Sequence, residues 1–408
     1  MSLGEGIRDF FYDSCDEVVY AGLELGPLIF QDDVARLADS PASVQAANIR
    51  MEALSECKLL DYNLKKSAYM VVGKKAARDT IKDDLRCSPI TLCGKEMPQV
   101  AEAKYLGDWI SEGGLSASIE CTIKKRVGLA TSAIYEIRSV VDDCRSKLCG
   151  SLQVGLEIWE LAVIPMLLFN SECWIGITNQ HLTELETLQK RFLKTLMAVG
   201  SGCPTPSLYW ETGTVGMKWR IIRSKLIFYH HLLTLPETSL ANEVLKIQES
   251  FELPGLVSEC KDFMTLHDIK DAEEYSKLQW KKLIKAKILE LNEAELVEQS
   301  QTYKKIDFTG SKFICQNYLR EMHCNDARSF FKLKTQMMPT VQMNFMRNPE
   351  FAKNLWTCQG CGVQKDSQAH IIVCPGYANL RTNRNLNSDG DLVDYFREVI
   401  RTRLEAAV

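Results

Sequence analysis

Three cysteines and one histidine in the last part of the sequence have the types and spacing of a metal site. Cys358, Cys361, His370 and Cys374 form the pattern C-x2-C-x8-H-x3-C. Three thiolates and one imidazole complete a tetrahedral Zn²⁺ site with no position left for water, which is typical of a structural site. The spacing therefore predicts a zinc module, which we expect either to bind nucleic acid or to hold the C-terminal helices together.

Two adjacent carboxylates form a second candidate site, near the start of the chain. The apolar run 18–29 is divided by its glycines and proline into two short strands joined at a turn, with Asp32 and Asp33 at the end of the second strand. Neighbouring carboxylates repel each other unless a cation offsets their charge, and Mg²⁺ favours carboxylate oxygen. Considered alone, the pair is more simply a solvated turn, because aspartate is common in turns.

The stretch 301–348 combines basic and aromatic side chains. Such a combination suits contacts with a nucleic-acid backbone and with stacked bases. The alternative, to which we give equal weight, is a helical segment whose aromatic side chains belong to the core. On the first interpretation, the residues that contact nucleic acid here are Lys304, Lys305, Arg328, Lys332 and Lys334.

Turn signals and hydrophobic periodicity place short strands and helices over the first 114 residues. Ser40 and Pro41 have the types of a helix cap and a first helical residue, so we expect a helix over about 40–57. A strand is expected over 68–72, and the charged stretch 74–87 is expected to be helical.

From residue 116 onward the pattern is helical. Apolar residues recur at three- and four-residue spacing over 119–141, and the polar face of this helix carries Lys124, Lys125 and Arg126. Pro165 limits or kinks the next helix, because proline lacks the backbone N–H that a helix interior needs. The further predicted helices cover about 151–168, 180–199, 218–235, 238–300 and 392–404.

The bulk composition is that of a globular protein without a basic coat. The chain has 408 residues and a formal net charge of −4, so any nucleic-acid binding must come from local patches. Fifteen cysteines, an odd number, favour a reducing compartment over a disulfide framework. No apolar run approaches the roughly 18 residues of a membrane span, and the first residues do not resemble a signal peptide. We therefore expect an intracellular protein, in the nucleus or the cytoplasm, with no membrane partner.

The order of these motifs resembles the C-terminal part of a non-LTR (LINE-type) retrotransposon reverse transcriptase. Phe30-Gln31-Asp32-Asp33 resembles the aromatic-x-Asp-Asp motif of the family's palm. Asn63-Leu64-Lys65-Lys66-Ser67, with the stretch 70–73 behind it, is similar to the family's Asn-x-x-Lys-[Thr/Ser] element. Lys104-Tyr105-Leu106-Gly107 resembles the primer-grip hairpin.

The resemblance continues through the helical part of the chain. The helix that carries Lys124 would begin the thumb. Ala162-Val163-Ile164-Pro165, followed by Asn170-Ser171-Glu172-Cys173-Trp174, resembles a thumb signature of the family, with Asn170 where a glycine is usual. The C-x2-C-x8-H-x3-C cluster resembles the zinc module that ends many of these polymerases.

The resemblance implies template-directed DNA synthesis on RNA, with an RNA template, a DNA primer and, where the palm is complete, a deoxynucleoside triphosphate as partners. In that chemistry two Mg²⁺ (or Mn²⁺) ions bridge carboxylates and the incoming triphosphate. By resemblance, Asp32 and Asp33 are metal ligands and Lys65 or Lys66 acts on the leaving pyrophosphate. The residues that hold the primer end are Tyr105, Leu106 and Gly107, and those that contact nucleic acid in the thumb are Lys124, Lys125 and Arg126.

The expected fold class is α+β. A palm-like antiparallel sheet remnant with helices is followed by a mainly α-helical thumb and connector and by a small zinc knuckle. The expected segments are a partial palm at 1–114, a thumb at 115–245, a connector at 246–350, a zinc module at 351–380 and a C-terminal helix at 381–408.

The same comparison predicts that the chain alone is inactive. The family's fingers, its first catalytic aspartate and most of its nucleotide pocket have no counterpart in this sequence, so we expect a C-terminal fragment of a polymerase. One alternative is a non-catalytic relic that binds nucleic acid with its thumb and zinc knuckle. A second is a helical zinc scaffold with no nucleic-acid role.

Overall fold

The fold comes from a computed structural model of the whole chain. It describes residues 18–20, 22–30, 33–58, 61–144, 149–303, 308, 311–335, 337, 357–363, 366–382 and 384–405. The chain divides into two compact units. Unit 1 contains Met1–Lys124, Asn170–Thr178 and Lys225–Trp280, and unit 2 contains Lys125–Phe169, Asn179–Ser224 and Lys281–Val408. The five segments expected from the sequence stay a prediction.

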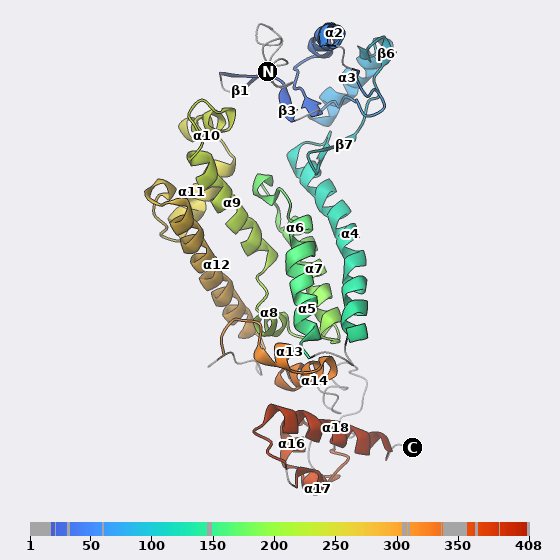
Figure 1. Cartoon of the computed structure of the whole chain (residues 1–408), viewed down its shortest axis with the longest axis vertical. Helices are drawn as coiled ribbons and strands as arrows, with labels where there is room; N and C mark the ends of the chain where they lie inside the picture. The colour runs from blue at the N-terminus through green and yellow to red at the C-terminus, as the bar shows by residue number, and fades with distance from the viewer. Residues whose placement is uncertain are drawn as a thin grey trace. The chain divides into compact units, whose positions relative to one another are not determined.

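The strands that the structure describes form antiparallel two-stranded hairpins in unit 1 (Figure 1). Together with the helices they make the chain α+β, as predicted. The strand expected over 68–72 is wrong, because Tyr69 makes only an isolated parallel bridge with Gln99. The pairs are β1 (Val18–Tyr20) with β2 (Leu23–Leu25), β3 (Leu28–Phe30) with β4 (Asp33–Ala35), β5 (Thr91–Leu92) with β6 (Lys95–Glu96), and β7 (Glu102–Tyr105) with β8 (Asp108–Ser111).

Helix α2 (Pro41–Lys58) forms where the cap signal predicts it. The Ser40 hydroxyl oxygen accepts a hydrogen bond from the Ser43 N–H at 3.2 Å, which satisfies one of the free donors at the helix start. Two side chains of α2 then fasten it to β5. Gln45 Oε1 accepts from Thr91 N at 2.8 Å, and the side-chain amide of Asn48 donates to Thr91 O at 2.8 Å. Helix α3 (Lys75–Cys87) follows, also as predicted.

A helical layer completes unit 1. It comprises the last turns of α9 (Met217–Leu233), α10 (Leu240–Ser250), α11 (Leu256–Leu266) and the first turn of α12 (Lys277–Ser300). Trp280 is fully buried there and donates from Nε1 to Leu226 O at 2.8 Å. His230 stacks on Trp280 and donates from Nε2 to Tyr275 O at 2.9 Å, so this histidine has a structural role.

Unit 2 is mainly helical. It contains α4 (Leu115–Cys144) from residue 125 onward, α5 (Ser151–Ile158), α7 (Asn179–Leu196), α8 (Thr205–Thr212), the start of α9 and α12 from residue 281 onward. The predicted apolar stripe of α4 is confirmed, since Ile123, Ala130, Ile134 and Val141 are buried. The predicted effect of Pro165 is also seen. After α5 the chain widens into a π-helical turn, Trp159–Val163, before α6 (Ile164–Leu167), because Pro165 cannot donate the usual helical hydrogen bond.

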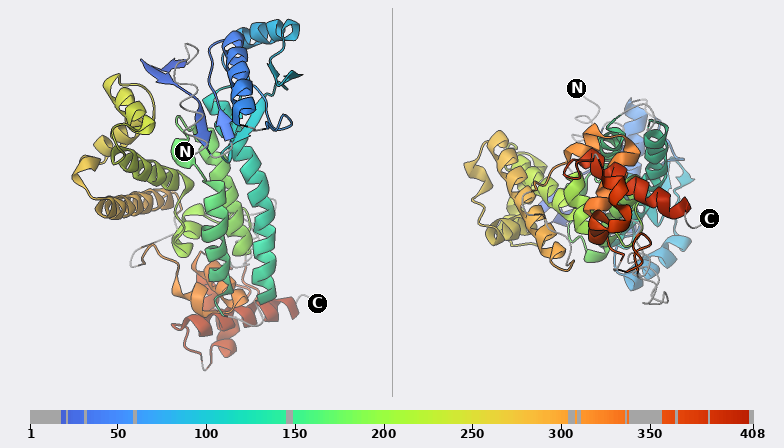
Figure 2. Two further views of the ribbon diagram at one scale, coloured as in Figure 1. Left: turned by 45° about the horizontal axis from the view of Figure 1, so that its top comes forward. Right: turned by 90° about the horizontal axis from the view of Figure 1, so that it is seen from below.

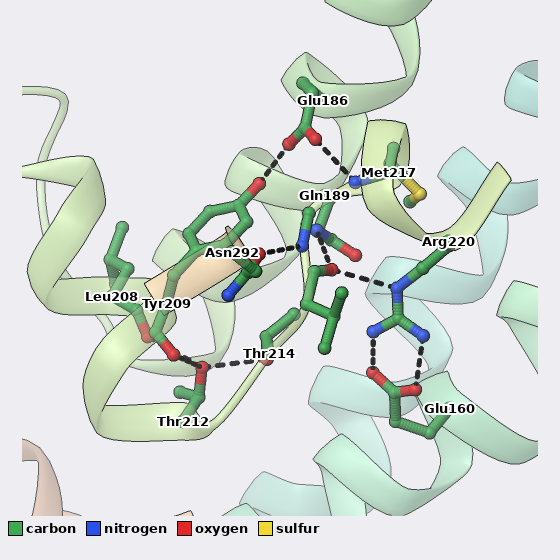
Figure 3. Close-up of polar contacts among 12 residues, drawn as sticks. Glu160, Glu186, Gln189, Leu208, Tyr209, Thr212, Thr214, Met217, Arg220 and Asn292 are labelled. Atoms are coloured by element: carbon green, nitrogen blue, oxygen red, sulfur yellow. Dashed lines mark hydrogen bonds and ion pairs between the residues drawn. The ribbon is translucent and has the colours of Figure 1, made fainter. Parts of the chain in front are cut away.

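A buried polar network holds the start of α9 in unit 2 (Figure 3). Glu186 on α7 accepts hydrogen bonds from the Tyr209 hydroxyl and, at 2.5 Å, from the Met217 N–H. Asn292 on α12 accepts from the neighbouring Gly216 N–H at 3.0 Å. The first turn of α9 is therefore capped by side chains from two other helices, since these N–H groups have no partner within their own helix.

The same network continues to the π-helical turn (Figure 3). Arg220 Nε donates to Val215 O at 2.9 Å, and the guanidinium makes a two-pronged ion pair with Glu160 at 2.5 and 2.7 Å. Gln189 Nε2 also donates to Val215 O, at 3.1 Å. These contacts bind α7, α9 and the turn that precedes α6 into one body.

The last elements of unit 2 are α13 (Asn317–Glu321), α14 (Cys324–Lys334), α16 (Gln368–Val373), α17 (Ala378–Arg381) and α18 (Asp389–Glu405). Figures 1 and 2 show α14 and α18 at the same end of the bundle of α4, α5 and α7. Arg397 of α18 forms an ion pair with Asp326 of α14, and the Gln368 side chain donates to Leu333 O at 2.7 Å. Within the described ranges, no helix combines the length and apolar character that a membrane crossing requires.

Candidate metal centre and acidic hairpin

The predicted zinc ligands converge in unit 2. The ligand atoms of Cys358, Cys361, His370 and Cys374 all lie within 4.8 Å of one another. Cys358 Sγ is 3.6 Å from Cys374 Sγ, and Cys361 Sγ is 3.4 Å from His370 Nε2. All of these cysteines are free thiols rather than disulfides.

Two separations between these ligand atoms match those expected around a tetrahedral Zn²⁺ ion. Zn–S bonds of about 2.3 Å and a Zn–N bond of about 2.0 Å place two sulfurs roughly 3.8 Å apart, and sulfur and nitrogen roughly 3.5 Å apart. The observed separations agree with both values to within about 0.2 Å. The cluster can therefore hold a metal such as zinc, as predicted, with His370 binding through Nε2.

Local backbone geometry brings the first two cysteines together. Gly362 has a φ of 68°, a left-handed value that glycine adopts without a steric penalty. The resulting turn lets Gly362 N donate to Cys358 O at 2.8 Å, and Gly360 N donate to Cys358 Sγ at 3.4 Å. An added Cβ at Gly376 would lie 2.1 Å from Gly360 O, so the two cysteine turns approach too closely for a side chain there.

Helix α16 presents the histidine. The Ser367 hydroxyl accepts from the His370 N–H at 3.2 Å and caps the helix. His370 Nδ1 is buried and has no hydrogen-bond partner among the described residues. Burial, followed by the neighbouring Cys358 thiol, raises the pKa of Cys374 to about 11. Because a metal binds the thiolate, metal uptake at this site must displace thiol protons.

The acidic hairpin differs in detail from the prediction. Phe30 pairs with Asp33 across β3 and β4. Gln31 and Asp32 lie outside the described residues. Asp33 is exposed. In the parts of the chain that the structure covers, the only group of three or more side chains suited to a metal is the Cys and His cluster. Asp33 therefore belongs to no such group among the described residues.

The predicted primer-grip residues form a tight hairpin in unit 1. Tyr105 pairs with Asp108 at the ends of β7 and β8, which leaves Leu106 and Gly107 as the turn. Both turn residues have positive φ, 47° for Leu106 and 91° for Gly107, as a two-residue turn of type I′ requires. Leu106 is a bulky residue in a conformation that it rarely adopts, and its side chain is exposed.

The β3–β4 and β7–β8 hairpins of unit 1 are linked by an electrostatic effect. Burial, followed by the nearby charge of Asp33, raises the pKa of the Tyr105 phenol. The Asp33 charge thus acts on Tyr105, although 71 residues lie between them in the chain. Lys65 is exposed and makes no ion pair with the described residues.

Two arginines predicted to bind nucleic acid are buried instead. Arg126 was expected on the polar face of its helix, but its guanidinium lies over the Phe169 ring and donates to Phe169 O at 2.5 Å. Arg328 donates to Leu196 O and pairs with Asp142, both at 2.8 Å. Both arginines therefore make their contacts inside the protein, since a buried charged group needs hydrogen-bond partners.

The lysines predicted to bind nucleic acid differ in exposure and in ion pairing. Lys334 is exposed and pairs with Glu211 at 2.8 Å, and Lys332 is partly buried on α14. Lys124 is exposed and pairs with Glu120, one turn earlier, while Lys125 is partly buried. Lys304 and Lys305 fall outside the described residues.

Most of the described aromatic residues in 301–348 are buried or stacked inside unit 2. Phe313, Tyr318, Phe330 and Phe331 are buried, and Phe308 stacks on Trp210 at 4.2 Å between ring centres. They belong to the core of unit 2. The interpretation as a stacking surface for bases is wrong for these residues.

Comparison with known proteins assigns the chain to no family. No family model and no curated protein matches the sequence. The function must therefore be argued from the metal cluster and the hairpins themselves.

One part of the metal centre has no signal in the sequence. Asp366 and Arg403 form a buried ion pair beside the cluster, at 2.6 Å, although 36 residues lie between them in the chain. Asp366 lies between the two pairs of ligands, which is a weak hint of a role. Arg403 belongs to the last helical turns and cannot be distinguished by type or spacing from the other arginines of α18.

Proposed function

We propose that the chain binds a primer–template nucleic acid as part of a reverse transcriptase of the non-LTR type, with a structural Zn²⁺ ion in its C-terminal module. The observations that carry the proposal are two tight hairpins within unit 1, one with Asp33 and one with Tyr105, and the effect of the Asp33 charge on the Tyr105 phenol. In the family that the sequence resembles, an acidic hairpin and a primer-grip hairpin act on the same primer end.

A second observation supports the proposal at one residue. Asn170 stands where the family usually has glycine, and it adopts a left-handed backbone with a φ of 55°. Asparagine is the residue that most readily replaces glycine in this conformation. Its side chain donates to Leu106 O at 3.3 Å, which links the thumb signature to the tip of the primer-grip hairpin.

The proposal for residues 1–408 is binding rather than nucleotide transfer. Transfer by two divalent ions requires several carboxylates around the metals. Among the described residues the hairpin supplies Asp33 alone, so we derive no chemical step through Mg²⁺ or Mn²⁺. The Tyr105 ring and the exposed Leu106 side chain offer apolar surface to the end of a primer, and stacking of this kind does not depend on base sequence.

Binding is tested by fluorescence anisotropy with a labelled DNA primer annealed to an RNA template. We expect salt-sensitive binding that Tyr105→Ala weakens by about 1–3 kcal/mol, the usual contribution of one stacked aromatic residue. The matched control is Tyr135→Ala, since Tyr135 is an exposed tyrosine on α4. Absence of binding at low salt, or equal losses in the two variants, would contradict the proposal.

Primer extension separates binding from catalysis. With Mg²⁺ or Mn²⁺ and deoxynucleoside triphosphates, we expect residues 1–408 to bind the primer–template without extending it. The alternative function, a non-catalytic nucleic-acid-binding relic, predicts that Asp32→Ala and Asp33→Ala leave the affinity unchanged. Extension by the purified chain that Asp32→Ala abolishes would establish catalysis and overturn the binding-only proposal.

A further inference from the structure

Arg403 and Asp366 form a buried ion pair against the metal cluster. The Arg403 Nη2 and Nη1 atoms lie 2.6 and 3.0 Å from the two carboxylate oxygens of Asp366. The Asp366 side chain is 0% exposed and that of Arg403 is 11% exposed. A buried pair of this kind is stable only where its remaining donors and acceptors are also satisfied.

The remaining donors of Arg403 point to the metal module. Nε donates to the Tyr377 hydroxyl at 2.8 Å, and the guanidinium lies over the Tyr377 ring at 5.3 Å. Nη2 also approaches Cys358 Sγ at 3.9 Å. Arg403 of α18 thus contacts three residues of the module, namely Cys358, Asp366 and Tyr377.

The charge of the cluster explains why a cation is placed there. Three thiolates, one neutral imidazole and one Zn²⁺ ion carry a net charge of −1, and the Asp366 carboxylate adds another negative charge beside them. Buried charge of one sign is costly unless a cation offsets it. Arg403 supplies this cation, and its planar donor fork satisfies the carboxylate with two hydrogen bonds at once.

A second arginine acts on the backbone of the same module. Arg381 Nη1 donates to Cys374 O at 2.7 Å and to the Tyr395 hydroxyl at 3.3 Å, and Tyr395 in turn donates to Ile371 O at 2.5 Å. Tyr395 and Phe396 of α18 are fully buried. Helix α18 therefore covers the module through both an apolar face and a polar contact network.

We propose that Arg403 is a positioning residue of the metal centre, and that metal binding and the docking of α18 are one coupled equilibrium. The inference rests on the metal binding proposed above. When the ion is bound, the thiolates attract Arg403 and hold α18 in place. When the ion is absent, the cysteines are protonated and neutral. The attraction between the cluster and Arg403 is then weaker, and α18 is held less firmly. The coupling is reciprocal, so a defect at Arg403 must lower the affinity for the metal.

The first test is competitive zinc titration of the full chain against a chromophoric chelator. We expect one Zn²⁺ per chain, and a 10- to 100-fold loss of affinity in Arg403→Met, the range found for residues that support metal ligands. Arg403→Lys keeps the charge but not the fork, so we expect an intermediate loss. The matched control is Arg401→Met, since Arg401 lies on the same helix with its side chain 66% exposed, and we expect its affinity to stay within about twofold of the parent.

The outcomes separate this inference from the proposal beneath it. If the parent chain binds no stoichiometric zinc, the metal centre itself is wrong. If the parent binds zinc and both Arg403 variants bind it as tightly as Arg401→Met, the metal centre stands and the role of Arg403 is refuted. Circular dichroism at equal zinc loading checks that each variant is folded.

Hydrogen exchange gives a second readout that needs no substitution. We expect the backbone amides of α18 to exchange at least tenfold faster after chelation of the metal, because α18 carries Arg403 and is held to the module by it. The backbone amides of α7 should keep their exchange rates. Equal exchange of α18 with and without the metal would overturn the coupling even if Arg403 variants bound zinc weakly.

Discussion

The side-chain amide of Asn170 donates a hydrogen bond to the carbonyl oxygen of Leu106 at 3.3 Å, and both residues hold a left-handed backbone. For a leucine this conformation costs roughly 1–2 kcal/mol, whereas asparagine tolerates it better. The tip of the β7–β8 hairpin is thus strained, and a contact from a distant segment holds it. Strain at an exposed loop tip is a sign of function rather than of stability.

Leu106→Gly is expected to stabilise the protein. Glycine relieves the left-handed strain but loses more conformational entropy on folding, so the net gain is about 0.5–1 kcal/mol in the free energy of unfolding. The same change at Leu129, an exposed position inside α4, is expected to cost about 1 kcal/mol. Urea unfolding measures both. A loss of stability in Leu106→Gly would show that the leucine side chain outweighs the strain.

Asn170 offers an independent check on this tip. Asn170→Gly keeps the left-handed backbone accessible, whereas Asn170→Ala loses both that tolerance and the hydrogen bond to Leu106. The alanine variant should therefore be less stable than the glycine variant by about 1 kcal/mol or more.

Local features of the fold could be predicted, and long-range ones could not. Ser40 and Pro41 mark the start of α2, and the metal ligands lie within 17 residues of one another, so a short window of sequence contains each signal. The apolar stretch 68–72 resembles a strand, but a sequence pattern does not show whether a partner strand is present. Only the structure reveals that Tyr69 has a single bridge.

Charged residues were the least predictable. Arg126 and Arg328 have the type and spacing of surface cations, yet each finds a backbone carbonyl from a distant segment. The partner of Arg403 is also far away in the chain. Periodicity shows which face of a helix is apolar, but it cannot show which cations on the other face meet a partner when helices pack together.

Glu112 makes stability depend on acid pH. The hydrogen bond from Lys82, at 2.5 Å, is the main cause that lowers the pKa of Glu112, and the charge of Arg78 adds to it. A carboxyl whose pKa is lower in the folded state stabilises the protein above its unfolded pKa of about 4.3, and this contribution is lost as the pH falls through the folded value. Glu112→Gln should therefore be less stable than the parent at pH 7 and equally stable at low pH.

Thermal unfolding of the parent and Glu112→Gln across pH 2–7 measures this difference, with pH 2 well below the ordinary pKa of about 4.3. Asp83→Asn is the matched control, because Asp83 pairs with Arg86 on the exposed face of α3. Exposed ion pairs contribute little to stability, so the unfolding temperature of Asp83→Asn should nearly equal that of the parent at every pH. A constant offset of Glu112→Gln at every pH would indicate a packing effect instead.

The hydrogen-bond network around α9 predicts that loss of the Tyr209 hydroxyl lowers the free energy of unfolding. Tyr209 donates to Glu186, which also caps Met217, and burial followed by the charge of Glu186 raises the pKa of Tyr209 well above its usual value (Figure 3). Tyr209→Phe leaves a partly buried carboxylate oxygen of Glu186 without its donor, so we expect a loss of about 1 kcal/mol in urea unfolding. Tyr303→Phe, at an exposed tyrosine, should change the stability by less than about 0.5 kcal/mol.

Arg328 distinguishes a structural cation from a nucleic-acid contact. Its guanidinium donates to Leu196 O and pairs with Asp142. Burial raises the pKa of Asp142, but the hydrogen bonds and charges of Arg328 and Arg138 together hold it below the ordinary value. Arg328→Met should lower the free energy of unfolding by about 1–3 kcal/mol, because it removes the donor to Leu196 O and one of the two arginine partners of Asp142.

The comparison is with Lys312→Met, an exposed lysine of the same basic stretch, which should unfold like the parent. A nucleic-acid contact at Arg328 would give the opposite pattern, with normal unfolding and a weaker, less salt-dependent interaction with a primer–template. Because Arg328 has its donors turned toward Leu196 and Asp142, a loss of affinity in Arg328→Met should appear only under conditions where the variant is partly unfolded. Measuring unfolding and binding on the same samples therefore decides which role the residue has.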